Sequence, residues 1–170
     1  MDGQDKALES TLAKALGCAQ KGEVSSMESA LHDVRIYAWN WGIVGGLPEI
    51  MIKRIAEIKH IGYPRGVERE LEKALQYARE GKVSSVHAVL YLAKRYAGLA
   101  RVDITKRVGE IYLVGYPRGV ERELEKALQC AQEGNFVAMK DGLEHASRYA
   151  SHAGLNIDGR IAEVKSALKK

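Results

Sequence analysis

The segment GYPRGVERELEKALQ occupies residues 62–76 and recurs without a change at residues 115–129, an offset of 53. Repetition at a fixed interval predicts an array of one structural unit, because such units bury their apolar faces against their neighbours. A fainter match lies nearer the start of the chain, where Leu12, Ala15 and Gly22 correspond to residues 59 positions further on. The sequence therefore predicts three repeats.

Apolar residues in the middle repeat have the spacing of an amphipathic helix. Val67, Leu71, Ala74, Leu75 and Ala78 fall at i, i+4, i+7, i+8 and i+11, on one helical face. Two more helical stripes follow in each repeat, and no segment alternates apolar and polar residues as a strand does. The predicted fold is all-α: a tandem array of three three-helix repeats, about nine helices, stacked as a solenoid or compact superhelical bundle.

The repeats are expected to occupy residues 1–61, 62–114 and 115–170 and to form one cooperative domain. Residues 39–47 are a Trp/Gly-rich insertion in the first repeat, which lengthens the offset to 59. Pro48, Pro64 and Pro117 are predicted at helix starts, where a missing N–H is harmless. Each Gly-Tyr-Pro step is therefore expected to end one helix and begin the next.

An arginine followed three residues later by a glutamate recurs in the third helix of every repeat. These arginines are Arg54, Arg107 and Arg160. Residues three apart on a helix are neighbours, so each pair is expected to stabilise its helix slightly. We expect these charges to brace the third helix against a neighbouring helix rather than to take part in catalysis.

Composition indicates a protein without a membrane segment. Apolar residues make up 46% and charged residues 28% of the 170 residues, and the net charge is +4. No apolar run approaches the ~18 residues that cross a bilayer. The first residues, MDGQDKALES, are polar and acidic, unlike a secretory signal. We expect a cytoplasmic protein.

Residues 124–150, LEKALQCAQEGNFVAMKDGLEHASRYA, have small residues at their apolar positions and a Gly-Asn turn. This segment resembles a tetratricopeptide helical hairpin. The repeats depart from that family in their third helix and in their period, which is about 34 residues in tetratricopeptide proteins. We interpret the likeness as shared packing of two helices and not as membership.

No motif in the sequence identifies a reaction or a ligand. The chain contains neither G-x-x-x-x-G-K-[ST] nor G-x-G-x-x-G, and no H-E-x-x-H. The five histidines share no position among the repeats, and they lack the spacing of metal ligands. We therefore expect no metal, no cofactor and no enzymatic activity.

The sequence identity between the last two repeats differs greatly from one segment to the next. All 15 residues of the GYPRG segment match, whereas only 12 of the 38 residues that follow do. Local copying or deliberate construction is one explanation, and a surface that binds the same partner twice is the other. The second explanation predicts contacts with a protein or peptide partner, or with another molecule of this protein, through Tyr63, Arg65, Tyr116 and Arg118.

Trp39 and Trp41 are the only tryptophans, and both lie in the insertion. Tryptophan is enriched in interface hot spots, so both residues belong to the predicted partner-binding set. The alternative is that they cover the open apolar end of the first repeat.

The excess of basic residues lies in the middle repeat, whose net charge is +4, against −1 for residues 1–61 and +1 for residues 115–170. A basic surface with nearby tyrosines is compatible with binding of RNA or DNA. This alternative function would use Lys94, Arg95, Arg101, Lys106 and Arg107. The excess is small for a nucleic-acid surface, so a protein-binding scaffold is the favoured prediction.

Overall fold

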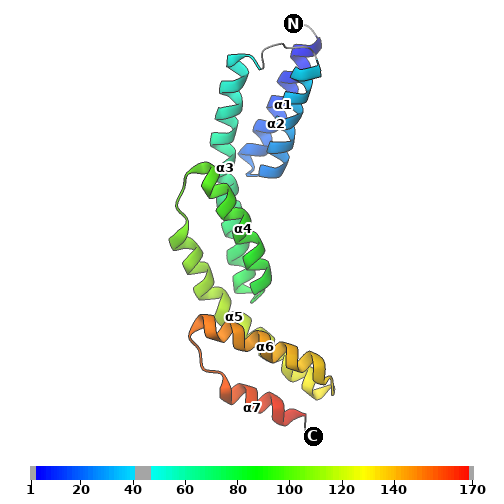
Figure 1. The fold of residues 1–170 in the computed structure, drawn as a ribbon, viewed down its shortest axis with the longest axis vertical. Helices are drawn as coiled ribbons and strands as arrows, with labels where there is room; N and C mark the ends of the chain where they lie inside the picture. The colour runs from blue at the N-terminus through cyan, green and yellow to red at the C-terminus, as the bar shows by residue number, and fades with distance from the viewer. Residues whose placement is uncertain (1–2, 41–46, 169–170) are drawn as a thin grey trace. The chain divides into compact units, whose positions relative to one another are not determined.

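The computed structural model describes residues 3–40 and 47–168, in which every regular element is a helix (Figure 1). The helices are α1 (Gly3–Gln20), α2 (Val24–Asn40), α3 (Glu49–Arg79), α4 (Val83–Ala100), α5 (Thr105–Gln132), α6 (Phe136–Ala153) and α7 (Asp158–Ala167). The all-α prediction is confirmed. Within this part of the chain the helices number seven, two fewer than expected.

Two helices are missing from the expected number because α3 and α5 run without interruption through the Gly-Tyr-Pro steps. Pro64 lies inside α3 and Pro117 inside α5, so the prediction of helix starts at these prolines is wrong. Pro48 does precede a helix, and its carbonyl oxygen accepts from the amide of Met51 at 2.9 Å. Proline holds φ near a helical value, so a helix continues through it where packing compensates for the missing N–H.

The chain forms two compact units. The first comprises Met1–Glu70 and Tyr91–Ile104, and the second comprises Leu71–Leu90 and Thr105–Lys170. In the first unit α1 packs along α2, and in the second α6 and α7 both pack on α5. The boundaries between the two units do not coincide with the boundaries between the predicted repeats, and one of them falls within α3. Each unit therefore combines parts of two repeats.

The core of each unit consists of the apolar stripes read from the sequence. Leu12 in the first unit and Leu71 and Leu124 in the second occupy equivalent repeat positions, and all three are fully buried. In the second unit Leu124 belongs to a cluster with Ala127 and Met139. None of the described helices has both the length and the apolar character needed to span a membrane.

Glycine ends the first helix of each repeat. Gly22, Gly81 and Gly134 have φ of 67°, 67° and 73°, the left-handed conformation that glycine adopts without strain. The amide of Lys82 then donates to the carbonyl oxygen of Tyr77 at 2.9 Å, and the same bond follows the other two glycines. Gly81 therefore caps the C-terminal end of α3.

Other glycines allow helices to approach closely. A Cβ on Gly66 would lie 2.2 Å from Cγ2 of Val24 in the first unit. A Cβ on Gly119 would lie 2.4 Å from Cγ2 of Val83 in the second. Both distances are shorter than any real contact, so the long helix at each Tyr-Pro step can sit against the neighbouring helix only because it carries glycine there.

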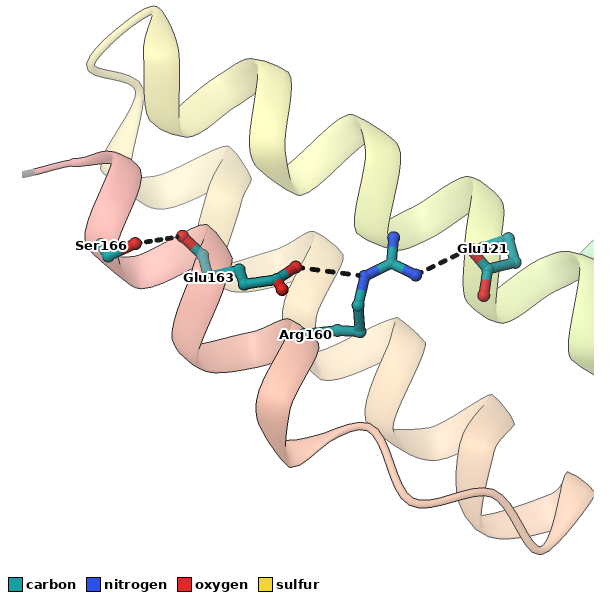
Figure 2. A network of polar contacts seen from close by, with 4 residues as sticks. All are labelled: Glu121, Arg160, Glu163 and Ser166. Carbon is teal, nitrogen blue, oxygen red and sulfur yellow. Dashed lines mark hydrogen bonds and ion pairs between the residues drawn. The ribbon is translucent and has the colours of Figure 1, made fainter.

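Two of the recurrent arginines, Arg54 and Arg160, join the third helical segment to the first helical segment of the same repeat. Figure 2 shows Arg160 of α7 between Glu121 of α5, at 3.3 Å, and Glu163 of α7, at 3.5 Å. In the first unit Arg54 pairs with Glu9 of α1, the equivalent of Glu121. The predicted bracing role is confirmed at these two positions.

Candidate protein-binding pockets

Tyr63 precedes the first proline of the repeated segment and is mostly enclosed, with 8% of its surface exposed. Its hydroxyl donates to Oε1 of Glu28 at 3.2 Å. Burial raises the pKa of the Tyr63 hydroxyl, and the negative charge of Glu28 raises that pKa further. Tyr63 therefore fixes α3 on α2 and presents little surface to a partner.

Tyr116, the equivalent residue of the second unit, lies in an aromatic cluster. Its ring stacks on Tyr112 with centroids 5.1 Å apart and on His152 with centroids 5.0 Å apart. Its hydroxyl is 3.2 Å from Nε2 of His87. Burial raises the pKa of Tyr116, with smaller contributions from Tyr112 and Tyr149. The cluster is half-buried, so its outer edges are open to solvent.

Arg65 and Arg118 are exposed, but the backbone of each residue packs closely against a glycine at the end of another helix. The carbonyl oxygen of Arg65 would lie 2.7 Å from a Cβ on Gly22, and that of Arg118 would lie 2.6 Å from a Cβ on Gly81. The guanidinium of Arg65 also donates to the backbone carbonyl of Gln20 at the end of α1. A cation is favourable at that position, because the last carbonyls of a helix lack intrahelical partners.

A cavity lies beside each Tyr-Pro step. We call the cavity of the first unit, of about 490 Å³, the first Tyr-Pro pocket, and that of the second unit, of about 120 Å³, the second Tyr-Pro pocket. The first is lined by Ala56, Lys59, His60, Tyr63, Pro64, Leu99, Ala100 and Arg101. The second is lined by Gly109, Tyr112, Leu113, Tyr116, Pro117, His152 and Ala153. Every residue lining the second pocket is the equivalent, 53 positions further on, of a residue lining the first.

The proline inside each long helix leaves one backbone carbonyl without its usual helical hydrogen bond. Proline has no N–H, so the carbonyl four residues earlier cannot receive its usual helical hydrogen bond, and the ring presses against that carbonyl. The carbonyls concerned belong to His60 and Leu113, both of which line the pockets. The end of α4 forms the other wall of the first pocket, and the end of α6 that of the second.

The two pockets differ in charge. Lys59, His60 and Arg101 give the first pocket a basic lining. In the second unit, Tyr112 and Leu113 are the equivalents of Lys59 and His60. Gly154 is the equivalent of Arg101. The second pocket is therefore aromatic and apolar, with His152 as its one basic lining residue.

Trp39, in the last turn of α2, has 86% of its surface exposed. It therefore covers no core in the described part of the chain, and it is accessible to a partner. Ile36 and Tyr37 on the same helix are also exposed. Trp41 lies outside the described residues.

The basic residues of the nucleic-acid alternative are divided between the units. Lys94, Arg95 and Arg101 are exposed on α4 and at its end, in the first unit, and Arg95 pairs with Glu28 at 3.5 Å. Lys106 and Arg107 are exposed at the start of α5, in the second unit. Three of the five predicted residues therefore belong to one unit, and one of these three also lines the first Tyr-Pro pocket.

The turn between α5 and α6 is open, unlike its equivalents. Phe136 has 60% of its surface exposed, whereas Val24 and Val83, at the equivalent positions, have 2% and 3%. A Cβ on Gly134 would meet no described atom within 4 Å, whereas Gly22 and Gly81 lie against a neighbouring helix. Val137, the next residue, is also exposed.

Sequence reasoning found the Tyr-Pro steps but missed the pockets and the exposed turn. Each pocket combines one stretch around a proline with the end of a helix more than 30 residues away, and helical periodicity does not report that proximity. One signal was available in the sequence. Glycine is favoured just after the end of a helix, and Gly154 occupies such a position. The equivalent residue in the preceding repeat is Arg101, which is unusual there.

The His, Cys, Asp and Glu side chains of residues 3–40 and 47–168 form no group of three or more that could hold a metal ion. Comparisons with protein-family models, with curated proteins and with solved structures found no match to this chain.

Proposed function

We propose that this protein is a non-enzymatic α-helical repeat protein of the cytoplasm that acts as a scaffold for protein–protein interaction. Its three repeats would stack as a solenoid or compact superhelical bundle, in which the last helix of one repeat continues into the first helix of the next. The equivalent packing of Gly66 on Val24 and of Gly119 on Val83 supports this arrangement, because the same helix contact is made in both units.

The observation that carries the proposal is the pair of Tyr-Pro pockets. Cavities with a few polar groups on an otherwise apolar wall are the usual form of a binding site. Here two such cavities form at equivalent positions beside identical segments. A partner with two similar binding elements, or two molecules of one partner, would use both.

The test is to fill both pockets without disturbing the core. Ala56→Gln and Gly109→Gln place a longer side chain at the equivalent exposed position of each pocket. Ala162→Gln is the matched control, because Ala162 is the third equivalent position and is exposed outside both pockets. The three proteins are used as bait in host extract, and the captured proteins are quantified by mass spectrometry.

We expect the wild-type and Ala162→Gln proteins to capture the same partner and the double variant to lose it, with equal helix content by circular dichroism. Equal capture by the double variant and the control would show that the pockets are not the binding sites.

Self-association is the second form of the proposal, and the open turn at Phe136 favours it. The equivalent Val24 is covered by the helix that carries Gly66. In α1, Ala7 is the equivalent of Gly66, and the exposed Tyr37 is the equivalent of the buried Tyr96. The α1 helix of a second molecule would cover Phe136, in a head-to-tail contact. Ala7 has the Cβ that Gly66 lacks, so the two helices would lie further apart in this contact. Phenylalanine is longer than valine, so the side chain of Phe136 would fill the wider gap.

Nucleic-acid binding is the alternative function. Lys94, Arg95 and Arg101 support it, because all three are exposed in one unit. Phosphate binding weakens steeply as salt increases, since each neutralised phosphate releases counterions. Replacing the three residues by glutamate should then abolish binding to a single-stranded oligonucleotide. Binding that persists in this variant would exclude the alternative.

A further inference from the structure

The first Tyr-Pro pocket contains cationic groups that have no partner within the described part of the chain. No hydrogen bond or ion pair joins the side chains of Lys59 and Arg101 to another described residue. None of the residues lining the pocket is acidic. Glu57 lines a neighbouring cavity that shares Ala56 and His60 with the pocket. The pocket therefore offers two positive charges without a described partner, beside the apolar surface of Pro64 and Leu99.

The backbone of Arg101 is strained. Its φ is 56°, and it is the only residue other than glycine with a positive φ among residues 3–40 and 47–168. Gly154, the equivalent residue, adopts φ of 66° without strain. Strain of this kind accumulates at functional sites, where the side chain has a role that glycine cannot fill. Glycine at this position would remove the charged side chain of Arg101, which lines the pocket.

His60 lines the pocket, and its carbonyl oxygen lacks the usual helical hydrogen bond from residue 64. Pro64 cannot donate to it, because proline has no N–H. A ligand that matches the charges and the apolar lining of the pocket therefore needs a negative charge and an apolar group. A peptide that contains an acidic residue beside an apolar one supplies both, together with backbone N–H groups.

We propose that the first Tyr-Pro pocket binds an acidic segment of a protein partner. A carboxylate of that segment lies between Lys59 and Arg101, and a neighbouring apolar side chain packs on Pro64 and Leu99. This assignment rests on the proposed scaffold function and narrows it to one class of partner. The second Tyr-Pro pocket, which lacks these cations, does not share the preference.

The substitutions for the test are taken from the equivalent positions of the second unit. Lys59→Tyr and Arg101→Gly install the residues found at the equivalent positions of the second unit, Tyr112 and Gly154. Arg101→Gly also relieves the backbone strain, so loss of binding in this variant is not explained by unfolding. The matched control combines Lys14→Gln and Lys94→Gln, which remove two exposed positive charges from the first unit outside the pocket.

The probes are a fluorescein-labelled hexapeptide of alternating glutamate and leucine, the same peptide with glutamine in place of glutamate, and a single-stranded oligonucleotide of equal charge. Binding is measured by fluorescence anisotropy. We expect the glutamate peptide to bind the wild-type protein at least about 10-fold more tightly than the glutamine peptide does. The double variant should lose about 10-fold in affinity for the glutamate peptide, and the control should stay within about twofold.

Equal affinity for the two peptides, or an equal loss in the double variant and the control, would overturn the assignment. Tighter binding of the oligonucleotide than of the glutamate peptide, abolished by Lys59→Tyr with Arg101→Gly, would assign the pocket to nucleic acid instead. Absence of peptide binding, combined with partner capture that still depends on Ala56 and Gly109, would overturn this assignment and leave the scaffold function standing.

Discussion

At the residue scale, much of the repeated segment has a structural reason to be identical in both places. Gly66 and Gly119 let their helices approach a valine closely, and the carbonyl of Arg65 lies against Gly22. The side chain of Arg65 also donates to the end of α1. Packing therefore accounts for the identity of these residues without a shared binding partner.

Arg101 gives the first prediction at this scale. Arg101→Gly should raise the free energy of unfolding by about 1 kcal/mol, because glycine adopts the left-handed conformation without strain. Gly154→Ala, at the equivalent position, should lower it by about as much. Urea denaturation of both variants measures the two changes. A less stable Arg101→Gly protein would mean that the guanidinium makes a stabilising contact in solution.

Tyr63 gives a prediction on pH. Its pKa is raised above 10.0 in the fold, so the folded state holds the phenolic proton more tightly than the unfolded chain does. The resulting stability is complete below about pH 10 and is lost as the pH rises through the folded pKa. Tyr63→Phe should therefore reduce the fall in stability above pH 10. Because the hydrogen bond to Glu28 is lost, it should also cost about 1 kcal/mol at neutral pH.

Denaturant unfolding between pH 7 and 11 measures both effects of Tyr63→Phe. Tyr91→Phe is the control, since it makes the same substitution at a strongly exposed tyrosine. Parallel pH profiles of wild-type and Tyr63→Phe proteins would contradict the assignment.

At the scale of the helices, close approach at glycine decides how α5 packs. A Cβ on Gly119 would meet Val83 at 2.4 Å and a ring carbon of Tyr149 at 3.2 Å. Gly119→Ala should therefore destabilise the protein by about 2 kcal/mol, because the helices must separate. Gly109 lies on the same helix with no atom near its Cβ position, so Gly109→Ala should stabilise the protein by about 0.5–1 kcal/mol.

Thermal and urea unfolding measure the change in stability for both variants, which carry the same substitution at two positions of one helix. If Gly119→Ala is as stable as Gly109→Ala, the close contact with Val83 is absent in solution.

The sequence predicted the helical class and the apolar stripes, both of which depend on residues close together in the chain. It did not predict the continuity of α3 and α5, because proline is favoured at the start of a helix and usually interrupts a helix when it lies inside one. The contacts that make glycine necessary come from Val24 and Val83, more than 30 residues away from Gly66 and Gly119. Tyr63 was expected at a binding surface for the same reason, since its burial depends on α2.

At the scale of the whole molecule, the exposed turn at Phe136 predicts association between molecules. Phe136→Asp should weaken this association, because it places a charge on the apolar contact, and Ala7→Trp should block the opposite face. Each variant alone is expected to be monomeric by sedimentation. A mixture of the two should form dimers, since each retains the face that the other has lost.

Leu155→Asp is the control for these variants, because Leu155 is an exposed apolar residue outside the turn. Association that is unaffected by Phe136→Asp, or that is lost equally in Leu155→Asp, would exclude the head-to-tail contact.

The continuity of α3 and α5 has a consequence for the history of the chain. Each of the two identical segments lies within a helix that begins before it and ends after it. A genetic crossover between the segments would therefore remove or add 53 residues while leaving an unbroken helix with its turns in phase. Descendants of this gene can gain or lose whole modules in one event, without a new linker.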